Sequence, residues 1–163
     1  MTAQSHQYTT RLVWTGNTGQ GTAGYTGYGR DYTVAVDGKP DLYGSSDPAF
    51  RGDPSRHNPE DLFVASLSAC HMLFFLSLAA RQGIRVLAYE DDAQGTMVTD
   101  GDGGGKFDEV VLRPRVTIAE GSDAELVAQL HVMAHERCFI ANSCNFTIRH
   151  EATMRVAPDG NAS

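Results

Sequence analysis

The sequence predicts an α+β fold, on three observations. Residues 62–80 contain no Asp, Glu, Lys or Arg, which favours a buried helix. Segments with alternating apolar and polar residues lie on both sides of this stretch, the pattern of half-exposed strands. Ser122-Asp123-Ala124-Glu125 has the form of a capping box and opens a second, shorter helix. The resulting order, β-β-α-β-β-α-β, lacks strict βαβ alternation and therefore indicates α+β.

Composition is that of an ordinary globular protein, with 41% hydrophobic and 20% charged residues among 163, and we expect one domain over residues 1–163. The net charge is −7 and no run of Lys or Arg occurs, which argues against nucleic-acid binding. The N-terminus lacks the basic-then-apolar order of a signal peptide, and the cysteine count of 3 is odd. A reducing, cytoplasmic location is therefore expected.

The first strands are expected within residues 1–46. Residues 11–15 form one candidate strand, and Tyr32, Val34 and Val36 form the apolar face of another, ended by the turn signal Asp37-Gly38. Residues 47–57 contain Pro, Gly, Asp and two arginines and are expected to form a loop.

The central helix is expected over residues 58–83. Asn58 can cap it, Pro59 suits its first position, and Gly83 is a natural stop. The apolar stretch is long enough to span a membrane. It also contains three serines and a histidine, which are costly in lipid, so we expect a buried helix and no membrane partner.

The second half continues with strands over residues 86–118, interrupted by a loop at residues 100–105. The second helix is expected over residues 122–138. Residues 145–157 alternate between apolar and polar side chains and predict a single, half-exposed C-terminal strand.

Two cysteines are candidates for chemistry: Cys70, within the apolar helix, and Cys138, after the second helix. A cysteine in an apolar helix is usually inert packing. It becomes reactive when a cation lies near the sulfur and a second thiol lies within disulfide range. Arginine suits the cation role because it is always charged and a carboxylate can hold its planar fork. Arg51 and Glu60, just upstream of Cys70, are the candidate pair.

Two motifs resemble the signatures of the OsmC/Ohr family. The first is Asn58-Pro59-Glu60-Asp61-Leu62-Phe63 followed by Cys70, and the second is Ala134-His135 with Cys138 and Ala141-Asn142-Ser143. The family consists of cysteine-based peroxidases that reduce organic hydroperoxides and are regenerated through a disulfide. The resemblance implies two antiparallel β-sheets around two central helices in an intertwined homodimer, with a dithiol reductant and no cofactor.

The resemblance also implies roles for individual residues. Cys70 matches the peroxidatic cysteine, Cys138 the resolving cysteine and Glu60 the carboxylate that orients the active-site arginine. Arg51 lies where the OsmC branch has this arginine, and Arg30 lies nearer the position used in the Ohr branch. We favour Arg51 and keep Arg30 as the alternative.

Three departures place the chain in a divergent branch of the family that it resembles. His71 follows Cys70 where an aromatic or apolar residue is commoner, which makes His71 a possible site residue. Phe139 follows Cys138 where proline is typical. Cys144 is additional and could resolve in place of Cys138, although at the start of a strand it is expected to be a buried thiol.

Helix geometry adds a constraint on the site. Glu60 and Cys70 are ten residues apart, which separates them by about 15 Å along a straight helix. They cannot share a site within one subunit. An antiparallel pair of helices in a homodimer could bring Glu60 of one chain towards Cys70 of the other, so a composite site is expected.

Two other functions are open. His131, His135 and Cys138 share one helix face, and Cys70-His71 could complete a tetrahedral zinc site, although the spacing matches no common zinc module. The chain could also be a non-catalytic, stress-associated binding dimer of the same fold.

Overall fold

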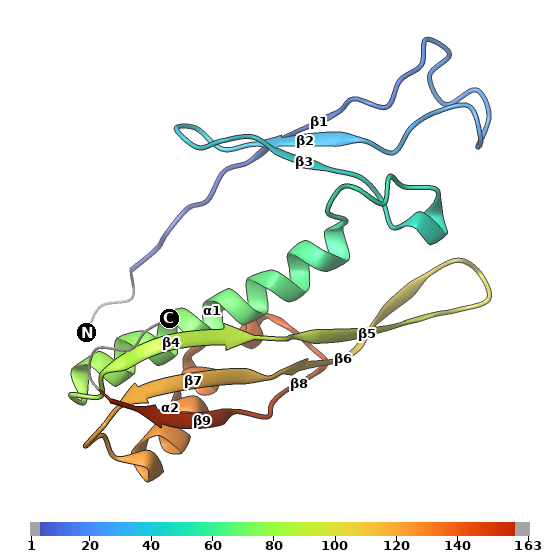
Figure 1. The fold of residues 1–163 in the computed structure, drawn as a ribbon. Coiled ribbons are helices and arrows are strands. Elements are labelled where there is room, and N and C mark those ends of the chain that lie inside the picture. Colours follow the sequence, from blue (N-terminus) through green and yellow to red (C-terminus); the bar gives the residue numbers. More distant parts are fainter. Residues whose placement is uncertain (1–3, 159–163) are drawn as a thin grey trace. The chain divides into compact units, whose positions relative to one another are not determined.

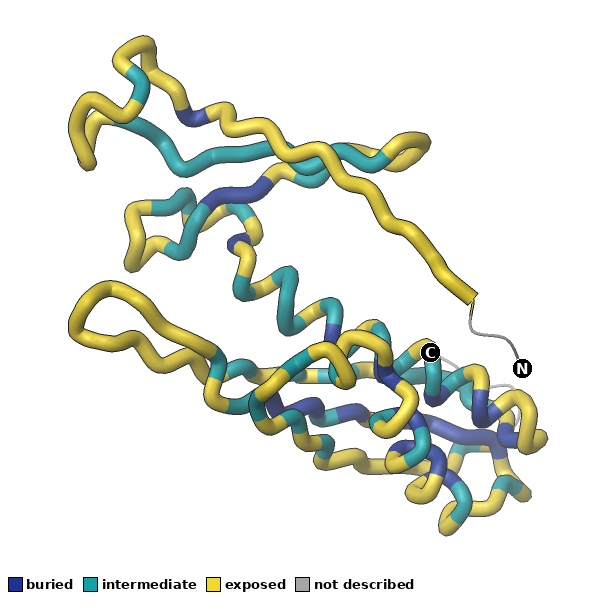
Figure 2. The backbone as a smooth tube through the Cα atoms, turned by 180° about the vertical axis from the view of Figure 1, so that it is seen from behind, coloured by how far each residue is buried: buried dark blue, intermediate teal, exposed yellow. Residues whose placement is uncertain are grey.

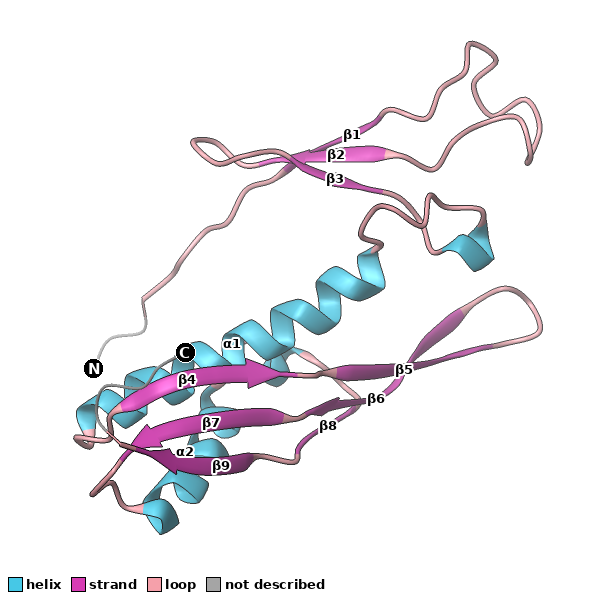
Figure 3. Ribbon diagram, viewed as in Figure 1, coloured by secondary structure: helices cyan, strands magenta, loops and turns pink. Residues whose placement is uncertain are grey.

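A computed structural model describes residues 4–158 of the protein, which form two compact units, each described by itself below (Figure 1). The first unit extends to Leu62 and the second begins at Phe63. Within the described residues the elements are two α-helices, two short 3-10 helices and nine strands, so the α+β prediction is confirmed (Figure 3).

The first unit contains one antiparallel sheet of three strands in sequential order. The strands are β1 (Arg11–Trp14), β2 (Tyr32–Ala35) and β3 (Leu42–Gly44). Gly38 has a φ of 73°, as the predicted turn after Asp37 requires. The loop predicted at residues 47–57 contains a 3-10 turn, η1 (Pro48–Phe50), capped by the Asp47 side chain.

The second unit contains two further three-stranded sheets. One has the order β4 (Val86–Asp91), β7 (Pro114–Ala119), β9 (Thr153–Ala157), and the other β5 (Gln94–Thr99), β6 (Gly105–Leu112), β8 (Thr147–His150). The β4–β7 and β5–β6 pairs are antiparallel, but β7–β9 and β6–β8 are parallel. The expectation of two purely antiparallel sheets is therefore wrong in number and in direction.

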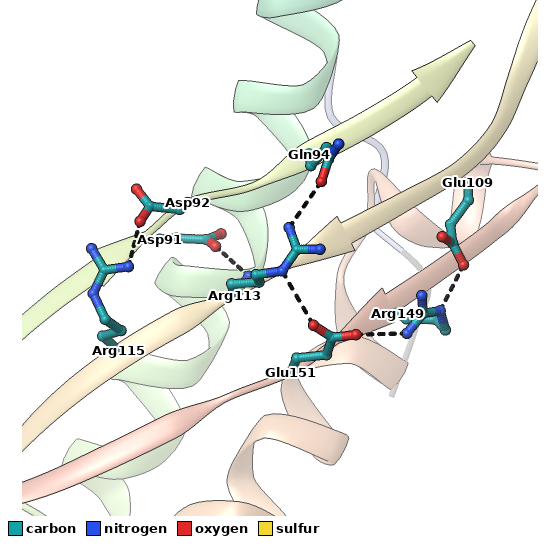
Figure 4. Close-up of polar contacts among 8 residues, drawn as sticks. All are labelled: Asp91, Asp92, Gln94, Glu109, Arg113, Arg115, Arg149 and Glu151. Atoms are coloured by element: carbon teal, nitrogen blue, oxygen red, sulfur yellow. Dashed lines mark hydrogen bonds and ion pairs between the residues drawn. The ribbon is translucent and has the colours of Figure 1, made fainter.

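The expected C-terminal strand is also divided, at residues where the neighbouring strands break. Side chains at the three breaks are joined to one another (Figure 4). The Arg113 backbone N–H donates to Asp91 Oδ1 at 2.6 Å, and Arg113 Nε donates to Glu151 Oε2 at 3.2 Å. The Glu151 N–H donates to the Leu112 carbonyl at 2.8 Å. These contacts satisfy backbone N–H groups that would bond to the neighbouring strand if the strands continued without a break.

The central helix, α1 (Pro59–Arg81), has the ends that the sequence predicts. The Asp61 N–H donates to Asn58 Oδ1 at 2.7 Å, so Asn58 is the N-terminal cap. Gly83 has a φ of 73°, and the following N–H of Ile84 donates to the Ala79 carbonyl at 2.9 Å.

The second helix, α2 (Ala124–Arg137), begins one residue later than the capping-box pattern implies. Its cap is Asp123, whose carboxylate accepts from the N–H groups of Glu125 and Leu126 at 3.0 and 3.1 Å. An ionised carboxylate is the stronger acceptor at a helix N-terminus, which explains why Asp123 and not Ser122 occupies the position.

The second unit is held by two apolar clusters, visible as the buried segments of α1, α2 and the strands in Figure 2. The larger lies between α1, α2 and the β4–β7–β9 sheet, and the smaller between α1 and the β5–β6–β8 sheet. Buried members of the larger are Phe75, Leu78, Ala79, Ile84, Val116, Ile118, Val127, Leu130 and Ala134. Those of the smaller are Leu67, Val110 and Leu112.

By length and composition alone α1 could cross a membrane, a test that core helices of soluble proteins also pass. Only 28% of its most apolar window is buried in this chain. Leu73 is 62% exposed, although five other α1 residues are buried. The helix therefore combines a face packed in the core with an apolar face that the described residues leave exposed.

Candidate functional site

The two predicted redox cysteines are neighbours in the second unit. Cys70 lies midway along α1 and is half-buried, whereas Cys138 directly follows α2 and is buried. Burial, and then a hydrogen bond with the Cys70 side chain, raises the pKa of the Cys138 thiol to about 11. Both thiols are free. The fold thus brings together two reduced cysteines that lie 68 positions apart in the sequence.

The segment around Cys138 is fixed by backbone and aromatic contacts. The Ala141 N–H donates to Cys138 Sγ at 3.4 Å as the chain enters the short helix η2 (Ala141–Ser143). Phe139, which is 72% exposed, meets the edge of Phe74 with ring centroids 4.9 Å apart. Phe74 lies one turn beyond Cys70 on α1, so this aromatic pair lies along the same helix face as the thiols.

Other apolar neighbours of Cys70 in the sequence belong to the core. Leu67 and Phe75 are buried, in the smaller and larger clusters respectively. The third cysteine, Cys144, is half-buried beside the smaller cluster, and its thiol donates to the Ile140 carbonyl at 3.2 Å. Burial raises its pKa. Cys144 therefore has a packing environment and a local hydrogen-bond partner.

Glu60 lies in the first turn of α1, in the first unit. Its Oε2 is buried and has no hydrogen-bond partner among the described residues. Its charge contributes to the raised pKa of Tyr32, after burial of that side chain. A buried carboxylate oxygen without a hydrogen-bond donor costs free energy, and a guanidinium could supply the missing donor.

Arg51 ends the η1 turn in a conformation unusual for its residue type. It is the only non-glycine residue with positive φ, 68°, in the described part of the chain. The next residue must be glycine, because a Cβ at Gly52 would lie 1.5 Å from the Ser46 carbonyl oxygen. No ion pair or side-chain hydrogen bond involves Arg51 among residues 4–158, and the residue is exposed. The loop thus holds a strained backbone beside an uncommitted guanidinium.

Arg30, by contrast, is held within its own loop. Its guanidinium donates to the carbonyls of Tyr28 and Tyr25 at 2.5 and 2.7 Å. It also lies over both tyrosine rings, 4.0 and 4.7 Å from their centroids. The two arginines and Glu60 belong to the first unit and the cysteines to the second. Within one unit, the structure brings together Cys70 and Cys138.

His71 does not accompany Cys70 at the surface but is turned into the core. Its Nε2 lies 3.0 Å from Nδ1 of His131, and both residues are buried. The rings of His135 and His150 complete a chain of four imidazoles, each ring centroid within 6.0 Å of at least one other. Sequence reasoning missed this cluster, although His131 shares a helix face with the apolar Val127 and Ala134.

The zinc hypothesis is not supported. Among the described residues, no group of three or more His, Cys, Asp or Glu side chains is arranged to hold a metal ion. His131 Nδ1 instead lies within hydrogen-bond distance of His71 Nε2, at 3.0 Å.

The comparisons agree with the fold. The OsmC-like protein family matches residues 52–153. An OsmC-like protein of unknown function from Vibrio cholerae is 32% identical, with a TM-score of 0.82 over 91% of this chain and 100% of that one. An organic hydroperoxide resistance protein OsmC from Legionella pneumophila is 22% identical, with a TM-score of 0.65 over 93% and 100%.

The organic hydroperoxide resistance protein OhrB of Bacillus subtilis is also 22% identical, with a TM-score of 0.57 over 91% of this chain and 98% of that one. No match is found among curated protein sequences. The family match covers more than half of the chain, and the Vibrio cholerae protein is similar over nearly all of it. The chain belongs to the OsmC/Ohr family.

Proposed function

We propose that the protein is a cysteine-based peroxidase that reduces organic hydroperoxides through Cys70 and Cys138. The observation that carries the proposal is the adjacency of these two free thiols, one half-buried on α1 and one buried after α2. Family membership supports it, as do the names of the Legionella pneumophila and Bacillus subtilis relatives.

The reaction has three balanced steps. The Cys70 thiolate attacks the distal oxygen of ROOH, the O–O bond breaks, and with one proton the products are Cys70 sulfenic acid and ROH. The Cys138 thiol then displaces water from the sulfenic acid, which forms the Cys70–Cys138 disulfide. A dithiol reductant reopens this disulfide by exchange and is itself oxidised to a disulfide.

The high pKa of Cys138, about 11, fits the resolving role better than the peroxidatic one. A thiol that stays protonated at neutral pH is a poor first nucleophile towards peroxide. Its hydrogen bond with Cys70 also keeps the second sulfur close to the first, so the sulfenic acid meets a thiol before it can be oxidised further.

Arg51 is the proposed cation, oriented by Glu60. Its guanidinium has no partner among the described residues, and Glu60 Oε2 lacks a donor, whereas Arg30 is occupied by two tyrosines. A homodimer with antiparallel α1 helices would carry the Arg51–Glu60 pair of one chain to Cys70 of the other. The open apolar face of α1, including Leu73, supports such an interface.

The proposed substrate has an organic tail. Exposed Leu73 and the Phe74–Phe139 pair offer apolar surface along the Cys70 face of α1, which favours an alkyl or aryl hydroperoxide over hydrogen peroxide. The three free thiols suit a reducing, cytoplasmic setting.

The test is a thiol count before and after one equivalent of an organic hydroperoxide, followed by mapping of any disulfide. We expect the loss of two thiols per chain and a Cys70–Cys138 link. Cys70→Ser should consume no peroxide, whereas Cys138→Ser should consume one equivalent and stop at the sulfenic acid. Cys144→Ser is the matched control and should react as the unmodified protein does. If the unmodified protein consumes no peroxide with any dithiol, the peroxidase proposal fails and the result supports the alternative, a non-catalytic binding dimer.

A further inference from the structure

The buried histidine pair lies on α1, which carries Cys70, and on α2, which Cys138 directly follows. His71 directly follows Cys70 on α1, and His131 precedes Cys138 by seven residues, two helical turns, on α2. The 3.0 Å contact between His71 Nε2 and His131 Nδ1 therefore joins α1, one residue after Cys70, to α2, two turns before Cys138.

The His71–His131 contact is a directional hydrogen bond, whereas the apolar side chains around it make contacts without a preferred direction. Phe75 stacks on His131 with ring centroids 4.0 Å apart, and the buried members of the surrounding cluster are apolar. Apolar side chains of similar size tolerate small shifts of one helix over another. A buried hydrogen bond does not, because a shift would leave two buried polar groups unpaired.

The hydrogen bond between two imidazoles requires one donor nitrogen and one acceptor nitrogen, and two neutral rings provide both. His71 Nδ1 and His131 Nε2 have no other partner among the described residues. The 3.0 Å contact is therefore the one side-chain hydrogen bond on which these two rings depend, and it can only be made across the helix interface.

We propose that the His71–His131 hydrogen bond is a latch that sets the register of α2 on α1 and so holds Cys138 in reach of Cys70. Both histidines are positioning residues, because neither is seen to contact the sulfurs. The inference rests on the proposed function for its biological use, but the geometry it explains, two neighbouring thiols, does not depend on peroxide.

The test uses thiol–disulfide equilibrium with the full-length protein in glutathione buffers. The latch predicts that His131→Leu weakens formation of the Cys70–Cys138 disulfide by about tenfold, the effect of losing one buried hydrogen bond. His131→Asn is the conservative variant, since an amide group can occupy the position of Nδ1. It should stay within about twofold of the unmodified protein.

A control variant of similar stability shows whether a changed disulfide equilibrium comes from the register of the helices or from a general loss of core stability. Val127 lies one turn before His131 on α2, is buried in the larger cluster and makes no side-chain hydrogen bond. Val127→Ala should lower the melting temperature at least as much as His131→Leu and leave the disulfide equilibrium unchanged. An equal shift in Val127→Ala, or no shift in His131→Leu, overturns the latch.

Failure of the two proposals is distinguishable. If glutathione forms the disulfide with the predicted dependence on His131 but organic hydroperoxide consumes no thiol, the latch stands and the peroxidase proposal fails. If peroxide oxidises Cys70 and the unmodified protein forms no Cys70–Cys138 disulfide in any buffer, the latch is wrong.

Discussion

The contacts of each guanidinium decide which arginine, Arg51 or Arg30, we propose as the cation for Cys70. Both lie upstream of Cys70, and the resemblance favoured Arg51 with Arg30 as the alternative. Arg30 has two carbonyl acceptors and two aromatic rings around its guanidinium. Moving it to a sulfur would break all of these contacts. Arg51 has no such contacts to lose, and its strained backbone is held by a glycine that no larger residue can replace.

Arg51→Met should therefore slow the oxidation of Cys70 by an organic hydroperoxide about 100-fold, because the thiolate and the developing alkoxide lose their cation. Arg30→Met is the matched control and should change the rate less than about threefold. The measurement is the pseudo-first-order loss of the Cys70 thiol in Cys138→Ser protein, where no disulfide can form. A large effect at Arg30 and none at Arg51 would reverse the assignment.

For single residues, what the sequence could predict depends on whether the residue acts within a local motif or through contacts with distant parts of the chain. Cys70, Cys138 and Glu60 lie in the two local motifs that resemble the family's signatures, so the resemblance could name them as candidates. The pairing of His71 with His131 could not, because it depends on how α2 packs on α1 across 60 positions of sequence. The helical spacing of His131, His135 and Cys138 instead left a zinc site open as an alternative.

At the scale of elements, helix ends were predictable because caps are local. Asn58 and Gly83 act as the sequence indicates, and only the second cap moved, from Ser122 to Asp123. Strand pairing was not predictable in this way. The parallel pairs β6–β8 and β7–β9 join segments separated by a whole helix, and hydrophobic alternation carries no information on strand direction.

The interface of α1, α2 and β8 should be sensitive to acid. Burial, with repulsion from neighbouring histidines, lowers the pKa of His71 to about 4 and that of His131 to about 3, from an ordinary value of 6.5. The groups facing them are His135 on α2, His150 on β8 and the Tyr89 ring on β4.

In the unfolded chain these histidines bind protons near pH 6.5, whereas in the folded chain His71 does so only near pH 4. The free energy of unfolding should therefore fall as pH drops from 6.5 to 4. Above pH 6.5 this contribution is constant. Urea unfolding at pH 7.5 and 5.0 measures the difference.

A double variant, His71→Gln with His131→Asn, can keep the hydrogen bond and cannot titrate, so its loss of stability on acidification should be clearly smaller. His57→Asn, at a side chain 72% exposed, is the control and should leave the dependence unchanged. Equal acid sensitivity in all three proteins would mean that the buried pair does not carry the effect.

For the whole molecule, the proposed roles of Arg51 and Glu60 place a constraint on the assembly, because these residues belong to the first unit and Cys70 to the second. Glu60 and Cys70 are ten residues apart on one continuous helix, so they lie about 15 Å apart along its axis in one chain. No rearrangement of the rest of the fold shortens that separation while α1 stays helical. If these residues have the roles proposed above, we expect the complete site to need two chains, with the exposed apolar face of α1 as the surface on which they meet.

Complementation between two inactive variants tests this directly. Glu60→Gln loses the oriented arginine and Cys70→Ser loses the nucleophile, so each homodimer has two defective sites. In a mixed dimer, one site combines the intact Glu60 of one chain with the intact Cys70 of the other, and the second site carries both defects. Unfolding and refolding an equimolar mixture should yield half mixed dimers and restore about a quarter of the unmodified activity. The same mixture without refolding is the control. If every site lay within one chain, refolding would restore nothing beyond the mean of the two parents, because no chain in the mixture carries both residues.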